Sequence, residues 1–323
     1  MNTTWGRGLL GAVTLGIATL LPAAPPAAPG AFAAVSNASA TGYRAIDLGA
    51  GFHSSAVAIN ERGHVAVVSG NRSVLWRDGK IIDLGVLSES LSSVVTDLND
   101  RDEVVGFGTD ADIARPFLWR NGRLTALEVL PGGDSTVAFG INNAGQVVGS
   151  GTTTARDGPH ALIWQAGRPI DLDPSGTWSL ARDITNNGWI IGESGGQATV
   201  WRRGVPTVLY SGTARAMNER HQVVGYASGS LLWSRGEVTD LGAPEGATAF
   251  EAQDVNNRSQ VVGNSTIGAV LWQRGAFVKL PLPPGGLPTG SAAFAINDRG
   301  QIVGSADILT AEGQETHAVL WTR

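Results

Sequence analysis

The apolar positions of this chain fall into short runs separated by Gly, Asn and Asp, and the runs recur as a unit. In one copy, residues 136–142 are β-prone, residues 143–145 have the composition of a turn, and residues 146–151 form a second, β-branched run. Residues 160–164 and 169–172 add a third and a fourth run. Short β-prone runs bounded by turn residues predict strands, so each unit is expected to hold four of them.

Seven copies of the unit follow one another. Each contains an apolar residue followed by Asn, or by Thr in a single case: Ile59-Asn60, Leu98-Asn99, Ile141-Asn142, Ile184-Thr185, Met217-Asn218, Val255-Asn256 and Ile296-Asn297. An aliphatic–Trp pair comes later in each copy, from Leu75-Trp76 to Leu320-Trp321. Successive Asn or Thr positions lie 33 to 43 residues apart, which is typical of β-propellers, solenoids and helical arrays. Apolar residues recur at helical spacing in no unit, which argues against a helical array.

The two ends of the chain favour a closed ring over an open solenoid. A fourth-strand motif follows each of the first six Trp pairs, whereas the seventh unit stops at Arg323. An extra copy of this motif, Ala45-Ile46-Asp47-Leu48-Gly49, precedes the first unit. An N-terminal strand that completes the last blade closes a propeller, and an open solenoid has no use for it. We therefore predict an all-β fold, a seven-bladed β-propeller of four-stranded blades spanning residues 43–323.

The N-terminal segment has the composition of a secretory signal peptide. Arg7 precedes an apolar run at residues 9–21, and the small-x-small pattern Ala31-Phe32-Ala33 follows. Residues 1–33 are thus predicted to be a signal peptide and residues 34–42 a short linker, with an uncleaved membrane anchor as the alternative. The expected location is secreted and extracellular, without membrane insertion after cleavage.

Composition narrows the classes of partner. The net charge is −5 and the basic residues are scattered, so nucleic acid is not an expected partner. The chain has no cysteine, which excludes disulfides and thiolate metal sites. With 44 Gly and only 16% charged residues, the composition is typical of an ordered, turn-rich β protein.

The repeated motifs resemble a known family. Ile-Asn-x-x-Gly-Gln-Val-Val-Gly, His-Ala-x-x-Trp and Asp-Leu-Gly together resemble the HAF repeat, an extracellular repeat family. Its His-Ala-Phe signature survives in part, as His160-Ala161-Leu162 and His317-Ala318-Val319. The resemblance extends over nearly all of the predicted mature chain. It implies a bacterial, exported protein and supplies no catalytic residue to transfer.

Two features have the form of catalytic motifs, and a structural interpretation is favoured for both. Gly192-Glu193-Ser194-Gly195-Gly196 has the letters of a nucleophile elbow, but that motif needs a following helix and this segment lies in a second strand and its loop. His160 and His317 share one place in two units, as repeat residues do. No cofactor or metal is therefore expected.

Two further sets of residues allow both a structural and a binding role. Asp97, Asp183 and Asp254 each precede an apolar–Asn or apolar–Thr pair; hydrogen bonding to the backbone is the favoured role, and a cation-binding ring is the alternative. The repeated Trp residues are expected in the core. Trp178 and Trp189 fall outside that register and could offer an aromatic platform for a sugar.

The order of the strands predicts where a site would lie. In a four-stranded meander, the connections after the second and the fourth strands share one face. The long connections fall there, at residues 109–114, 152–159, 281–290 and 307–315. Variable loops on a rigid scaffold often carry function. We therefore predict an off-centre binding site on this face, lined by Asp110, Asp112, Arg115, Arg156, Asp157, Asp307 and Glu312.

The favoured function is a non-enzymatic binding module, monomeric, that recognises an extracellular protein or glycan. An exported propeller enzyme of the glycosidase or lyase type is the alternative, with acids converging from several blades. A structural protein of the cell envelope is a third possibility. Paired carboxylates in a pocket would favour the enzyme, and a flat face with exposed aromatic side chains would favour binding.

Overall fold

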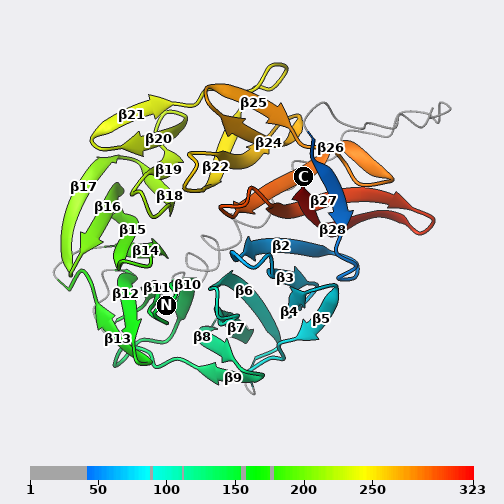
Figure 1. Cartoon of the computed structure of the whole chain (residues 1–323). Helices are drawn as coiled ribbons and strands as arrows, with labels where there is room; N and C mark the ends of the chain where they lie inside the picture. Colours follow the sequence, from blue (N-terminus) through cyan, green and yellow to red (C-terminus); the bar gives the residue numbers. More distant parts are fainter. Residues whose placement is uncertain (1–41, 88–89, 111–112, 154–157, 175–177) are drawn as a thin grey trace, which may run out of the picture.

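The computed structural model describes residues 42–87, 90–110, 113–153, 158–174 and 178–323. These residues form seven antiparallel four-stranded sheets arranged as the blades of a ring (Figure 1). The regular structure of the described residues is entirely β. The predicted seven-bladed β-propeller is thus confirmed. The predicted signal peptide and most of the linker lie outside the described residues.

The blades follow the chain in order, with their first strands around the axis (Figure 1). Blade 1 comprises β2 (Ser54–Ile59), β3 (Val65–Ser69), β4 (Arg72–Arg77) and β5 (Lys80–Asp83). Blade 2 comprises β6 (Ser92–Leu98), β7 (Val104–Asp110), β8 (Ile113–Arg120) and β9 (Arg123–Ala126). Blade 3 comprises β10 (Thr136–Ile141), β11 (Val147–Gly151), β12 (His160–Gln165) and β13 (Arg168–Asp171).

The second half of the ring repeats this plan with small variations in strand length. Blade 4 comprises β14 (Ser179–Ile184), β15 (Trp189–Ser194), β16 (Gln197–Arg202) and β17 (Val205–Ser211). Blade 5 comprises β18 (Thr213–Met217), β19 (Val223–Tyr226), β20 (Ser230–Ser234) and β21 (Glu237–Asp240). Blade 6 comprises β22 (Phe250–Val255), β23 (Val261–Ser265), β24 (Gly268–Gln273) and β25 (Ala276–Lys279).

Blade 7 combines the two ends of the chain, as the extra fourth-strand motif at residues 45–49 predicted. It comprises β26 (Gly286–Ile296), β27 (Ile302–Thr310), β28 (Gly313–Thr322) and, as its outermost strand, β1 (Arg44–Asp47). β1 pairs antiparallel with β28, with Arg44 opposite Thr322. Figure 1 shows the blue β1 beside the red β28. Closure therefore rests on four residues of the N-terminal segment.

The core lies between neighbouring blades. One cluster, for example, joins Val303 and Leu320 of blade 7 to Val65 and Val67 of blade 1. The Trp residues of the repeats contribute to this packing, and Trp321 is fully buried. Apolar faces of small twisted sheets are thus covered face to face, which is how a propeller buries side chains that a single blade could not.

Two of the predicted long connections are extended hairpins in the structure, so their interpretation as irregular loops was wrong. β7 continues to Asp110 and β8 begins at Ile113. In blade 7, β27 and β28 stay paired until Thr310 lies opposite Gly313. The polar residues of these segments are typical of loops, but strands that project from a sheet can be polar on both faces because neither face is buried.

Candidate functional site

The Asn residue of each repeat joins its blade to the next one. The Oδ1 of Asn60 accepts the backbone N–H groups of Arg62 and His64 and so fixes the turn after the first strand. Its Nδ2 donates to the carbonyl oxygen of Asn99 in blade 2, at 3.0 Å. The same link recurs around the ring and ends with Asn297 Nδ2 donating to the carbonyl of Asn60, also at 3.0 Å. The marker of the sequence repeat is therefore a structural clasp.

The chain of clasps is broken between blades 4 and 5, where Thr185 replaces Asn. Its Oγ1 bonds within its own turn, to Asn187 and Trp189. The neighbouring blade is held instead by His221, which stacks on Trp189 with ring centroids 4.1 Å apart. The Arg202 guanidinium also lies 5.0 Å from the centroid of the Trp189 ring. Trp189 is thus engaged within the protein and does not form the free sugar platform that its position suggested.

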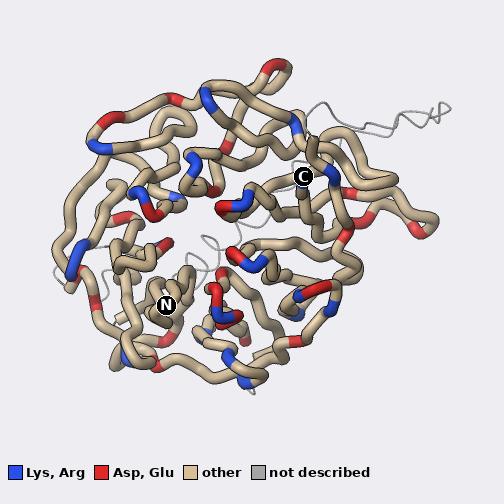
Figure 2. The backbone as a smooth tube through the Cα atoms, in the orientation of Figure 1, with Lys and Arg blue, Asp and Glu red and all other residues tan. Residues whose placement is uncertain are grey.

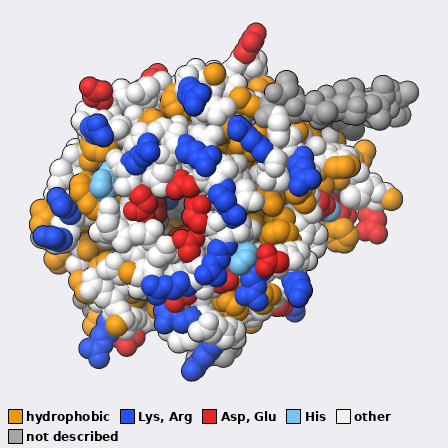
Figure 3. All heavy atoms as spheres, viewed as in Figure 1, with side chains coloured by type: hydrophobic (Ala, Val, Ile, Leu, Met, Phe, Trp, Pro, Cys, Tyr) orange, Lys and Arg blue, Asp and Glu red, His pale blue; other side chains and the backbone are white. Residues whose placement is uncertain are grey.

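The residues directly after the clasp form a second ring around the axis. Their side-chain oxygens accept backbone N–H groups of the preceding blade, as Asp100 does from Glu61 at 2.8 Å. Other links of this kind join Glu61 to Asp298 at 2.7 Å and Glu219 to Asn186 at 2.7 Å. Figure 3 shows acidic side chains in red at the centre with basic side chains in blue around them, and Figure 2 shows acidic and basic positions of the backbone next to each other around the axis.

In five repeats the next residue is an arginine. We call these five residues the arginine collar: Arg62, Arg101, Arg220, Arg258 and Arg299. Sequence reasoning did not single out either ring. In the described part of the chain, no group of three or more His, Cys, Asp or Glu side chains could hold a metal ion. Many of the side-chain oxygens in the second ring accept backbone N–H groups of the preceding blade. The central carboxylates therefore serve first to hold neighbouring blades together.

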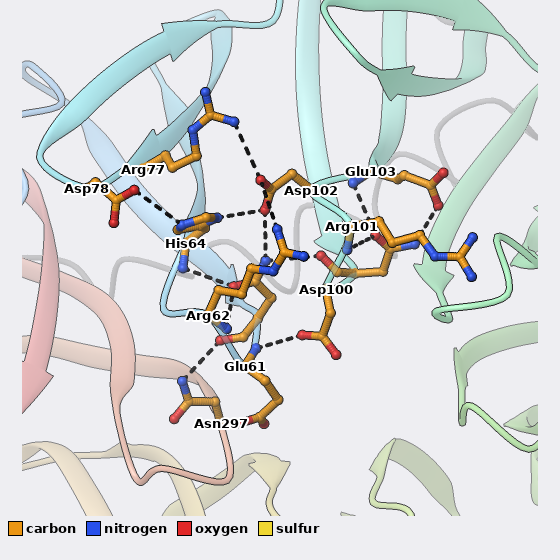
Figure 4. A network of polar contacts seen from close by, with 12 residues as sticks. Glu61, Arg62, His64, Arg77, Asp78, Asp100, Arg101, Asp102, Glu103 and Asn297 are labelled. Carbon is orange, nitrogen blue, oxygen red and sulfur yellow. Dashed lines mark hydrogen bonds and ion pairs between the residues drawn. The ribbon is translucent and has the colours of Figure 1, made fainter.

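A buried His–Asp pair lies beside this ring, between blades 1 and 2 (Figure 4). His64 Nδ1 is 2.6 Å from Asp102 Oδ1, and both side chains are about nine-tenths buried. In blade 3 the residue at the His64 position is Gln146, which accepts the Nδ2 of its clasp Asn at 2.9 Å. In blade 1 that role passes to Asp102, which accepts Nδ2 of Asn60 at 3.1 Å. The pair therefore substitutes for the glutamine that blades 3, 5, 6 and 7 have at this position, and it has a structural explanation.

Three carboxylates bridge alternate blade interfaces close to the axis. Asp97 accepts the backbone N–H of Leu98 and, across the interface, that of Ile141. Asp183 and Asp254 repeat this arrangement in blades 4 and 6. Blades 1, 3, 5 and 7 carry Ala or Gly at this place. The predicted backbone-bonding role of the three Asp residues is confirmed.

The same three carboxylates have raised pKa values. Burial raises the pKa of Asp254 to about 7, and the charge of Asp183 adds to the effect. Burial likewise raises the pKa of Asp183 to about 6. Burial and the charge of Asp183 hold the pKa of Asp97 well above its ordinary value. An acid with a higher pKa in the folded state holds its proton more tightly there, so its ionisation destabilises the fold.

We expect the free energy of unfolding to fall as the pH rises from about 4 to about 7, because the unfolded-state pKa of an Asp is near 3.9 and that of folded Asp254 is about 7. Each unit of pKa difference corresponds to about 1.4 kcal/mol. Asp254→Asn removes this titration, so its stability profile should be flatter than that of the wild type. Urea denaturation across this pH range measures both profiles, and parallel curves would contradict the assignment.

The residues predicted to line a site are divided between two hairpins and segments outside the described residues. Asp112, Arg156 and Asp157 lie outside the described residues. We define the loop face as the face that carries the turns after the second strands and the connections between blades. The other four residues lie on this face: Asp110 at the end of β7, Arg115 in β8, Asp307 in β27, and Glu312 in the turn before β28.

Asp110 lies in the blade 2 hairpin and Asp307 in the blade 7 hairpin, and blade 1 separates the two hairpins. Asp307 is also occupied within its own hairpin. It accepts Thr316 Oγ1 at 2.7 Å and Gln314 Nε2 at 3.1 Å. Asp110 and Glu312 are exposed at the ends of their hairpins. The structure therefore places these four charges on the hairpins of blades 2 and 7, on either side of blade 1.

Exposed apolar side chains on the loop face are the feature that sequence reasoning missed. Five of them lie in the hairpins and connections of the same three blades: Phe52 (56% exposed), Val86 (45%), Leu91 (76%), Ile113 (38%) and Leu309 (59%). We call these five residues the apolar surface. They lie in two connections and two hairpins, with Val86 and Leu91 in the same connection between β5 and β6, so no periodic pattern marks them. Exposed apolar side chains on neighbouring blades of one face can mark an interaction surface.

A histidine stands beside the apolar surface on blade 7. His317 Nδ1 is 2.8 Å from Asp47 Oδ2, and its Nε2 is 3.2 Å from Glu315. Partial burial lowers the pKa of His317, but the two carboxylates outweigh burial and raise this pKa above its ordinary value. His160 makes the equivalent contact with Asp171 at 2.8 Å in blade 3. The shared blade position predicted for the two histidines is thus confirmed, and Phe52 lies 6.2 Å from the His317 ring.

Comparisons with known proteins identify the fold. No family model matches the sequence, and no curated protein matches it. Among solved structures, the chain is similar to the extracellular domain of a protein described as a one component system of B. thetaiotaomicron, with 10% identity and a TM-score of 0.51. The match covers 86% of this chain and 39% of that one. At this identity the likeness supports the propeller fold alone.

Two further structures match less closely. TolB from Acinetobacter baumannii has 11% identity and a TM-score of 0.41, covering 56% of this chain and 51% of that one. A gluconolactonase from Xanthomonas campestris has 11% identity and a TM-score of 0.44, covering 86% and 89%. The chain thus spans about half or less of the length of the TolB and one component system structures. Among the described residues, no helix is long and apolar enough to cross a membrane.

Proposed function

We propose that the protein is a secreted, non-enzymatic binding module that recognises an extracellular protein through the loop face of blades 7, 1 and 2. The observation that carries this proposal is the apolar surface, in which Leu91 and Leu309 are the most exposed members. The signal-peptide pattern of residues 1–33 and the resemblance to HAF repeats support the exported setting. A closed ring with a rigid core is a suitable support for such a surface.

The chemistry of the surface favours a protein over a glycan. Four of its five members are aliphatic, and sugars are bound mainly through hydrogen bonds and aromatic faces. Charged residues border it, including Asp110 next to Ile113 in the blade 2 hairpin. An apolar centre with a polar rim is the usual anatomy of a protein–protein interface. The predicted aromatic platform for a sugar is weakened because Trp189 contacts His221 and Arg202.

The test uses the chain from residue 42 to 323 and two matched double variants. Leu91→Asp with Leu309→Asp places charges in the apolar surface, whereas Val205→Asp with Val238→Asp places them on exposed outer strands of blades 4 and 5. Partners cross-linked to the wild type in a culture of the source bacterium are identified and purified. Their affinity for each variant is then measured by surface plasmon resonance.

We expect the first variant to weaken binding at least tenfold, because a buried unpaired charge is costly at an interface, and the control variant to bind as the wild type does. Equal loss in both variants, or loss in neither, would contradict the proposal. An array of glycans and cell-wall polymers, with product analysis of every hit, provides the other arm. Binding to a glycan that survives in the first variant would replace the protein partner with a glycan, and cleavage would replace the module with an enzyme.

A further inference from the structure

Every first strand has a β-bulge at the same place, three residues before the clasp residue. In blade 4 the register shifts between Ala181 and Asp183, and in blade 5 it shifts between Ala214 and Ala216. Bulges redirect side chains and are frequent next to functional sites. The bulged residues at the axis are Val57, Thr96, Phe139, Arg182, Arg215, Gln253 and Phe294. Only blades 4 and 5 carry a charged residue there.

The two arginines are held side by side on the inner wall of the ring. Arg182 Nε lies 3.1 Å from Glu193 Oε1, and Glu193 is buried. Arg215 donates through Nε at 3.0 Å and through Nη2 at 2.5 Å to the amide oxygen of Gln253. In the part of the chain that the structure describes, no carboxylate forms an ion pair with Arg215. Arg215 is therefore bound to a neutral acceptor, whereas Arg182 is bound to a carboxylate.

The surroundings of Arg215 disfavour its positive charge. Burial lowers the pKa of Arg215, and the nearby positive charge of Arg182 lowers it further. Glu251 and Glu193 act in the opposite direction, but Glu251 is exposed and its charge is screened by water. Glu193 is buried, Arg182 and Arg215 are partly exposed, and the three groups together carry one net positive charge. Charges that are partly withdrawn from water are normally paired, so the surplus positive charge makes this part of the inner wall suited to an anion.

We propose that Arg215 and Arg182, with Gln253, form a binding site for the carboxylate group of a small organic anion. A guanidinium presents paired N–H donors that match a carboxylate. A single negative charge would balance the net charge of Arg182, Arg215 and Glu193, whereas a phosphate dianion would exceed it. Thr213 and Glu251, on the loop-face side of the bulges in β18 and β22, are exposed. The ligand enters from that side, and the Arg182 side chain is 20% exposed.

This site does not depend on the apolar surface, because it lies at the axis between blades 4 and 6. The probes are galacturonate and galactose, which differ by a carboxylate, together with acetate and inorganic phosphate. Isothermal titration calorimetry of residues 42–323 measures the binding of each. We expect galacturonate and acetate to bind competitively, galactose not to bind, and phosphate to bind at least tenfold more weakly than galacturonate.

Three variants locate the site. Arg215→Gln should weaken galacturonate binding at least tenfold. Glu251→Gln should strengthen it a few-fold because it removes a like charge, and this variant remains informative if Arg215→Gln does not fold. Arg220→Gln, in the arginine collar of the opposite face, should leave it unchanged. Equal binding of galactose, tighter binding of phosphate, absence of any binding, or unchanged affinity in both Arg215→Gln and Glu251→Gln would each overturn the proposal.

Discussion

A chain that begins at Gly49 is expected to lose its cooperative unfolding transition, or at least about 5 kcal/mol of stability. It lacks β1, which supplies the outermost strand of blade 7. Tyr43 and Leu48 are buried beside that strand, and burying one large apolar side chain is worth about 2 kcal/mol. The Tyr43 hydroxyl also donates to the carbonyl of Gly300 at 2.9 Å. Since domains are stable by about 5–15 kcal/mol, this loss consumes much of the total, and urea denaturation followed by Trp fluorescence measures it.

Two controls separate ring closure from simple shortening of the chain. A chain that begins at Gly42 keeps β1 and should unfold as the chain of residues 34–323 does. A permuted chain that carries residues 43–49 after Arg323, joined by an Asn-Gly turn, should regain most of the stability. Such a join is feasible because Arg44 lies opposite Thr322 in an antiparallel pair. Equal stability of the Gly49 and Gly42 chains would show that the ring does not need this strand.

The fold could be predicted because the same physical requirement recurs seven times. Each blade needs a tight turn after its first strand, and an Asn that binds the turn and the next blade meets that need at Asn60 and its equivalents. Repetition turns a weak local signal into a strong one. It also revealed the missing fourth strand, because the motif at residues 45–49 had no other place in the count.

The candidate sites could not be predicted in the same way, because they are made of residues in which the blades differ. Leu91 and Leu309 lie in connections of unrelated sequence, so their exposure is evident only once the ring brings blades 7, 1 and 2 together. Arg182 and Arg215 have no charged equivalent in the other blades, and the bulge that turns them to the axis is invisible in the sequence. Contacts between residues in different blades, such as the stacking of Trp189 on His221, follow from three-dimensional closure.

The glycine of the second strand has a steric role that predicts a large mutational effect. In blade 3, a Cβ added at Gly149 would lie 2.0 Å from the carbonyl oxygen of Val137 and 3.0 Å from Trp164 Cζ3. The oxygen belongs to the backbone of the bulged strand, so it cannot move aside without shifting the ladder. Gly149→Ala is therefore expected to destabilise the protein by about 3 kcal/mol or more, as overpacking of a tight core does. Urea denaturation measures the change.

Gly167→Ala in the same blade separates this clash from the general cost of replacing glycine. Gly167 has a φ of +79°, and a Cβ added there would meet no other group within 4 Å, so its replacement should cost only about 1 kcal/mol through backbone strain. Blade 1 offers the reverse case, because Val67 occupies the Gly149 position and is fully buried. Blade 1 must therefore leave room for the Val67 side chain at a position where the other six blades pack directly against a glycine. If Gly149→Ala costs no more than Gly167→Ala, the bulged strand yields easily, and close packing is not what keeps glycine at this position in six of the seven blades.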